Sequence, residues 1–128
     1  QAVLDKEILI NSDGTQVRNF VSVNEVCRLI DFMITHFYDG KLLPKVFNFR
    51  GDWTLSILDI ATLIATQYEK QFEFSPPIKV RKRTKNLIPK LNFNYNLIIN
   101  SGFKPKNNNM EDINELFLYV KNNFVDVR

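Results

Sequence analysis

The chain has few of the residues from which common catalytic and cofactor-binding motifs are built. Its 128 residues include 4 Gly, a single Cys and a single His. The glycines lie far apart, so neither the dinucleotide-binding pattern Gly-x-Gly-x-x-Gly nor a phosphate-binding P-loop occurs. There is also no apolar run long enough to cross a bilayer and no signal-peptide pattern at the start of the sequence. We therefore expect no membrane partner.

The lone cysteine and the lone histidine do not indicate a reactive centre. Cys27 cannot form an internal disulfide, and this cysteine usage fits a reducing compartment, so we expect a cytoplasmic protein. Cys27 also falls on the apolar face of a predicted helix, which favours a buried, inert thiol over a nucleophile. His36 has no supporting group around it, and carboxylates are scattered. We therefore expect no catalytic residue and no metal site in this chain.

Enough apolar and charged residues are present for one packed domain. Hydrophobic residues make up 45% of the chain, and the formal net charge is +3. This length and composition predict a single domain over residues 1–128 and argue against disorder. The mild positive charge permits an anionic ligand but does not require nucleic acid.

Hydrophobic spacing predicts alternating strands and helices, which favours an α/β layer architecture. The predicted strands cover residues 7–11, 17–23, 45–49 and 78–80, and the predicted helices cover 24–37, 57–68, 94–101 and 111–124. We expect the strand at 7–11 to pair near 17–23. Ser56 and Asp59 have the spacing of a capping box for the second helix, and residues 50–54 are expected to form a loop.

One stretch, residues 13–24, combines a turn, a strand and the start of a helix. Asp13 and Gly14 are strong turn formers, and the valines and phenylalanine that follow suit a buried strand. Asn24 can cap the next helix. Arg18 is the informative residue, because a guanidinium beside an apolar strand needs a partner. A phosphate or a carboxylate is the natural one.

A second group of cations lies between residues 81 and 90. Such a run is usually a solvated loop, but some of its members, Arg81, Arg83, Lys85 and Lys90, could instead bind a phosphate. Nucleic acid is a weaker option, since aromatic residues are not clearly interleaved with these cations. Phe49 and Trp53 could stack on a ligand, although core packing is the default for both.

Three segments, taken in order, resemble motifs of one enzyme family. Residues 13–24, DGTQVRNFVSVN, are similar to the DGTQxRDFVYVDD segment of extended short-chain dehydrogenases/reductases that act on nucleotide-diphosphate sugars. Residues 47–57, FNFRGDWTLSI, align without gaps to a YNIGGGEPVSI-like segment of that family, and residues 101–105, SGFKP, are similar to its LGFKP segment. Each motif alone is modest, but together they indicate the C-terminal part of the NAD-dependent epimerase/dehydratase family.

The resemblance implies an α/β fold made of the last Rossmann strands and helices plus a small substrate-binding subdomain. It implies that the N-terminal cofactor-binding half is lacking, and residues 1–4 would be the tail of a helix that starts upstream. In the family that half carries a glycine-rich turn and a Tyr-x-x-x-Lys pair, and no tyrosine here has a lysine four residues later. We therefore expect this chain to bind no cofactor and to lack catalysis alone. NAD(P) is implied for the complete enzyme.

The resemblance also implies which residues bind substrate. Arg18 would contact the diphosphate of a nucleotide sugar, with Asn19 beside it. A second arginine would meet the same diphosphate; Arg83 is the best match, with Arg81 and Lys90 as competitors. Departures such as Asn19 and Arg50 leave the substrate open and allow a divergent or inactive member.

Two function hypotheses follow. The first is the substrate-binding portion of a nucleotide-sugar epimerase, dehydratase or reductase, and it needs Arg18 in a pocket shared with residues 81–90. The alternative is a non-catalytic basic module for an anionic polymer such as nucleic acid, and it needs the basic run on a flat face. If the N-terminal half is lacking, open sheet edges would also predict a homo-oligomer formed through an exposed edge or apolar face.

Overall fold

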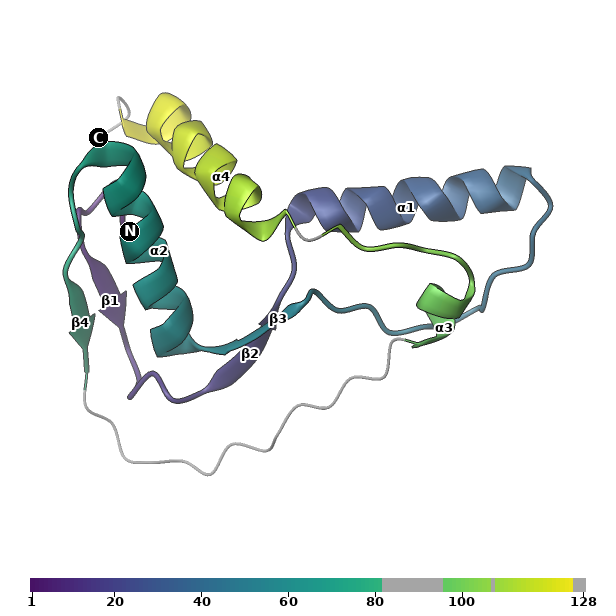
Figure 1. Cartoon of the computed structure of the whole chain (residues 1–128), viewed down its shortest axis with the longest axis horizontal. Helices are drawn as coiled ribbons and strands as arrows, with labels where there is room; N and C mark the ends of the chain where they lie inside the picture. Colours follow the sequence, from purple (N-terminus) through teal and green to yellow (C-terminus); the bar gives the residue numbers. More distant parts are fainter. Residues whose placement is uncertain (82–95, 107, 126–128) are drawn as a thin grey trace. The chain divides into compact units, whose positions relative to one another are not determined.

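The computed structural model describes residues 1–81, 96–106 and 108–125. Within these residues the protein is a small mixed α/β structure with two two-stranded sheets and four helices (Figure 1). The order is β1 (Ile8–Ile10), β2 (Val17–Phe20), α1 (Val23–Tyr38), β3 (Trp53–Ser56), α2 (Ile57–Phe72), β4 (Ile78–Val80), α3 (Asn96–Asn100) and α4 (Asn109–Phe124). The coarse prediction of an α/β protein is confirmed.

The chain divides into two compact units. Unit 1 comprises Gln1–Arg18, Leu55–Pro89 and Asn108–Arg128, and unit 2 comprises Asn19–Thr54 and Lys90–Asn107. Each unit is therefore built from segments that are distant in sequence. The expectation of one domain over residues 1–128 remains a prediction.

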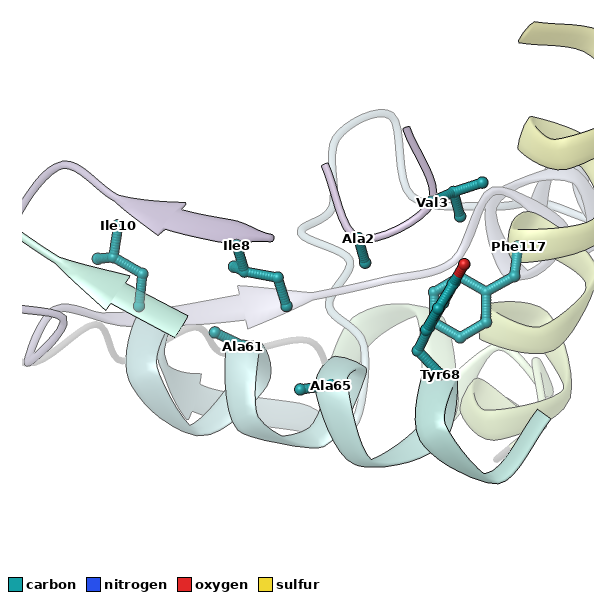
Figure 2. Close-up of a cluster of buried hydrophobic side chains, with 8 residues drawn as sticks. All are labelled: Ala2, Val3, Ile8, Ile10, Ala61, Ala65, Tyr68 and Phe117. Atoms are coloured by element: carbon teal, nitrogen blue, oxygen red, sulfur yellow. The ribbon is translucent and has the colours of Figure 1, made fainter. Parts of the chain in front are cut away.

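Unit 1 is organised around a parallel strand pair and a helix. β1 and β4 pair in parallel, with Ile8 opposite Ile78 and Ile10 opposite Val80. Figure 2 shows the core between β1, α2 and α4, in which Tyr68 is only 2% exposed. The buried cluster is Ala2, Val3, Ile8, Ile10, Ala61, Ala65, Tyr68 and Phe117. Because a two-stranded sheet is marginal alone, its packing against α2, which α4 covers in turn, accounts for its stability.

Unit 2 has a smaller core. Leu29 of α1, Ile98 of α3 and Phe103 are buried together, with Phe32 and Phe49 packed against them. The ring of Phe103 meets both of these aromatic rings edge to face, at centroid distances of 5.4 Å and 5.7 Å. Such edge-to-face pairs add to the burial energy of the rings.

A buried carboxylate fastens the segment after α3 to α1. Glu25, 8% exposed, accepts hydrogen bonds from Arg28 (2.8 Å) and from the backbone N–H of Lys106 (3.1 Å). Arg28 also donates to the carbonyl of Lys104 at 3.1 Å and lies over the ring of Phe103. Glu25 and Arg28 together thus hold this segment to α1 through the carbonyl of Lys104 and the N–H of Lys106.

Two strand predictions are wrong. β1 pairs with β4 and not with residues 17–23, whereas β2 pairs with β3. No strand forms at residues 45–49, and one forms instead at 53–56, partly within the expected loop. A close backbone approach explains this shift, because a Cβ on Gly51 would lie 1.8 Å from the carbonyl oxygen of Phe20. Glycine alone lets the chain pass there before it enters β3.

The helix predictions are mostly confirmed, with a different cap for α1. Ser22 caps this helix by accepting from the N–H of Glu25 at 3.1 Å, so the expected cap Asn24 lies inside the helix. The capping box of α2 is present as predicted, with the side chains of Ser56 and Asp59 each bonded to the other's backbone. The acidic first turn of α4, with Glu111 and Asp112, is also confirmed.

The expected burial of the strand predicted at 17–23 and of one α1 face is wrong. Val17 and Val21 are 40% and 42% exposed, and Cys27, expected to be buried, is exposed. α1 turns Leu29 toward its own unit, and Cys27 lies about 160° around the helix from Leu29, so it faces outward. Among the described residues, no helix is long and apolar enough to cross a membrane.

Candidate anion-binding site

The turn before β2 is fixed by its own side chains. Asp13 accepts hydrogen bonds from the backbone N–H (3.0 Å) and the hydroxyl (2.7 Å) of Thr15. Gly14 has φ = 77°, which favours glycine, and its carbonyl accepts from the N–H of Leu58 at 3.0 Å. The carbonyl of Gln16 accepts from the N–H of Ile57 at 2.9 Å. The start of α2 therefore sets where β2 begins.

Arg18 lies on β2 with an exposed side chain and two weak bonds. Its guanidinium donates to the carbonyl of Val17 at 3.2 Å and to the side-chain oxygen of Gln16 at 3.3 Å. Both distances lie at or beyond the long end of the usual range, and both acceptors are neutral. Within the described residues, no carboxylate forms an ion pair with Arg18. The guanidinium has five N–H donors, so most of its donor capacity is left for an anion.

Asn19 uses its side chain for structure. Its amide nitrogen donates to the carbonyls of Gly51 (2.7 Å) and Trp53 (3.1 Å) and to the hydroxyl of Thr54 (3.0 Å). Its amide oxygen accepts from the N–H of Gly51 at 2.9 Å. Asn19 therefore anchors the chain that leads into β3, and a ligand contact would have to replace some of these bonds.

The predicted second cation site is only partly described. The backbone N–H of Arg81 donates to the carbonyl of Ile10 at 2.9 Å, so it continues the β1–β4 ladder, and its side chain is exposed. Arg18 and Arg81 belong to the same unit, although they share no hydrogen-bond partner in the described chain. Arg83 and Lys90, like Lys85, lie outside the described residues. The predicted pairing of Arg18 with one of these cations stays a prediction.

Two other candidate residues from the sequence, Phe49 and His36, make contacts within the fold. Phe49 packs in the core of unit 2, in agreement with the default reading of that aromatic. His36 bonds through Nδ1 to the carbonyl of Phe32 at 3.0 Å, one turn back in α1. In the ranges that the structure covers, no three His, Cys, Asp or Glu side chains lie close enough to hold a metal ion.

Sequence reasoning overlooked the bond between Glu25 and Arg28. A signal was present, since oppositely charged residues three apart on a helix are neighbours. The spacing indicates an ion pair, but it gives no sign that Glu25 is buried or that it binds the backbone of Lys106. Those bonds depend on how residues 103–106 return to α1.

Comparison with known proteins adds no assignment. No family model matches the chain, and neither a curated protein nor a solved structure matches it.

Proposed function

We propose that this chain is the substrate-binding portion of an NAD(P)-dependent enzyme that modifies nucleotide-diphosphate sugars, in which Arg18 anchors the diphosphate. The chain would hold the nucleotide so that the sugar meets a cofactor bound by another part of the complete enzyme, in the cytoplasm. The reaction would be an epimerisation, a dehydration or a reduction. The resemblance to extended short-chain dehydrogenases/reductases supplies this assignment.

The observation that carries the proposal is the state of Arg18. An exposed guanidinium on a short strand makes only two long hydrogen bonds, both to neutral oxygens of neighbouring residues. Most of its N–H donors are therefore left for an anionic ligand. A diphosphate can then accept forked, charge-assisted hydrogen bonds from it.

Structural roles of two motif residues also support the proposal. Gly14 needs its positive φ, and Gly51 needs the absence of a Cβ, so the first two segments that resemble the family hold a glycine with a definite backbone role. Asn19 joins these two segments directly through its bonds to Gly51. Within unit 2, the two motif segments are therefore joined to each other by direct hydrogen bonds.

Binding of nucleoside diphosphates tests the proposal. A thermal-shift screen would use UDP-, dTDP-, GDP- and CDP-sugars, because a ligand that binds only the folded state raises the midpoint of unfolding. We expect at least one to stabilise the chain. Arg18→Gln should then weaken binding by about tenfold or more, since it removes a charge-assisted hydrogen bond to phosphate. Lys70→Gln, which removes one exposed positive charge from α2 in the same unit, is the matched control and should bind like the native chain.

A salt titration separates this function from binding to an anionic polymer. Polymer binding releases many counterions and weakens steeply with salt, whereas a bound diphosphate involves few charges. The proposal fails if no nucleotide sugar stabilises the chain while a single-stranded oligonucleotide does. It also fails if Arg18→Gln and Lys70→Gln weaken sugar-nucleotide binding equally.

A further inference from the structure

The outward side of α1 carries a narrow stripe of apolar side chains. Five of them are exposed although they are large and hydrophobic: Val23 (78%), Val26 (36%), Ile30 (50%), Ile34 (51%) and Phe37 (77%). At 3.6 residues per turn, they fall within an arc of about 80° on the helix surface. This outward stripe borders the face that holds Leu29 against Ile98 and Phe103, and Ile30, at its centre, lies about 100° around the helix from Leu29.

The described residues of unit 2 do not cover the outward stripe. In Figure 1, the chain that returns from the end of α1 and the segment with α3 lie along one side of this helix. The core contacts of α1 come from Leu29, Phe32 and Met33. Exposed apolar stripes of this width mark interaction surfaces, because a soluble helix normally buries its apolar side.

The spacing of the stripe indicates its partner. Successive members are separated by three, four, four and three residues, so the pattern is the same in both directions from Ile30. A twofold axis at Ile30 would place Val23 of one copy level with Phe37 of the other, and Val26 level with Ile34. Interfaces of twofold dimers require this kind of self-complementary surface. We propose that α1 pairs in antiparallel fashion with α1 of a second copy of this chain, centred on Ile30.

The size of the stripe sets the strength of this dimer. α1 has 16 residues, and a helix of that length is about 24 Å long and about 10 Å wide. A single pair of helices therefore covers well under the roughly 800 Å² per partner of a standard interface. The dimer should therefore be weak and in equilibrium with monomer. This inference does not depend on Arg18 or on the proposed function.

Sedimentation of the native chain over a range of concentrations tests the dimer. We expect the average mass to rise from monomer to dimer as the concentration increases. Ile30→Lys should raise the dissociation constant by more than about tenfold, because it places two charges at the centre of an apolar contact. Thr35→Lys adds the same charge on an exposed position off the stripe and should leave the equilibrium unchanged. Circular dichroism confirms that both variants keep their helices.

Cross-linking tests the antiparallel order. In a Cys27→Ser background, Ile30→Cys should cross-link to itself, since the twofold axis brings the two side chains face to face. Val23→Cys should cross-link poorly to itself but readily to Phe37→Cys when the two are mixed. The proposal is overturned if the native chain is monomeric up to millimolar concentration, as would follow if unit 1 of the same chain covered the stripe. It is also overturned if Val23→Cys cross-links best to itself, which indicates a parallel pair.

Discussion

α1 and α2 invite comparison, because each has 16 residues and each starts at a serine cap. α2 buries Ile60, Ala61, Ala65 and Tyr68 in unit 1, whereas α1 buries only Glu25 and Leu29 in unit 2. Among the described residues, the cluster of unit 1 contains eight buried residues, and that of unit 2 contains three. Because burial of apolar area is the main source of stability, unit 1 should be the more stable unit.

The difference shows how each unit is held together. Unit 1 relies on side-chain packing between a sheet and two helices. Unit 2 adds hydrogen bonds between side chains and backbone to a small core. Arg28 and Asn19 donate to the carbonyls of Lys104 and Gly51, and Glu25 accepts from the N–H of Lys106. Its apolar stripe on α1 stays exposed. This exposed stripe is the surface through which we propose that α1 pairs with a second copy of the chain.

Among the substitutions considered, Phe117→Ala should cause the largest loss of stability. Phe117 is 5% exposed and meets the ring of Tyr68 edge to face at 5.2 Å. Removal of a buried phenylalanine side chain leaves a cavity and should lower the free energy of unfolding of unit 1 by about 3–5 kcal/mol. Urea denaturation measures the change. Tyr119→Ala, on an aromatic residue of the same helix that is 58% exposed, should cost far less. Equal losses would show that the assigned core of unit 1 is wrong.

Gly51→Ala should disturb unit 2 next most strongly. A Cβ would meet the carbonyl oxygen of Phe20 at 1.8 Å, so the backbone must move and the four bonds of Asn19 must rearrange. We expect a loss of about 1–3 kcal/mol, measured by hydrogen exchange at β2 and β3. Gly40→Ala is the comparison: nothing lies within 4 Å of a Cβ there, so any loss comes from its positive φ (68°) alone and should be smaller than the loss at Gly51. An equal effect at both glycines would mean that the close approach is not decisive.

Arg28→Met should show that the partly buried ion pair of unit 2 contributes more to stability than an exposed ion pair of unit 1. Arg28 satisfies the buried carboxylate of Glu25, so its loss should cost about 1–3 kcal/mol. Lys79 of unit 1 pairs with Glu7, but the Lys79 side chain is 62% exposed, and Lys79→Met should cost less than about 1 kcal/mol. Thermal unfolding compares the two variants. The account of unit 2 is wrong if Lys79→Met is the more damaging change.

Ser56→Ala should have the smallest of these effects, a loss of about 1 kcal/mol. It removes the capping box in which Ser56 accepts from the N–H of Asp59 at 3.0 Å. The first residue before α4, Asn108, makes no capping bond through its side chain, so Asn108→Ala should be close to neutral. Chemical denaturation detects the difference. A similar loss at both positions would contradict the assigned cap.

Local features were the most predictable from the sequence. Ser56 and Asp59, the periodic faces of α2 and α4, and the strand after the Pro76–Pro77 break all depend on residues a few positions apart. Strand pairing was not predictable, because the partner of Ile8–Ile10 lies about 70 residues away and only the completed core selects it. The shift of a strand from 45–49 to 53–56 depends on Gly51 approaching Phe20, which no local pattern reveals.

Of the candidate site, only its central residue, Arg18, could be predicted from the sequence. Arg18 stands out in the sequence as a lone cation beside apolar residues, and the structure gives it no carboxylate partner among the described residues. The role of Asn19 was missed, because an amide between a strand and a loop gives no sign of its partners. The outward position of Cys27 was missed for a related reason. The apolar arc of α1 is wider than one face, so spacing alone cannot select the face that is buried.

Backbone amide chemical shifts give the most direct test of the claim that Arg18 anchors a diphosphate. The isotope-labelled chain would be titrated with UDP, GDP, dTDP and CDP, and in parallel with the nucleosides that lack phosphate. The account predicts that at least one diphosphate shifts the amide signals of Gln16 to Asn19, that its nucleoside does not, and that Arg18→Gln abolishes the response. Shifts that are equally large for a nucleoside, or that persist in Arg18→Gln, would contradict it.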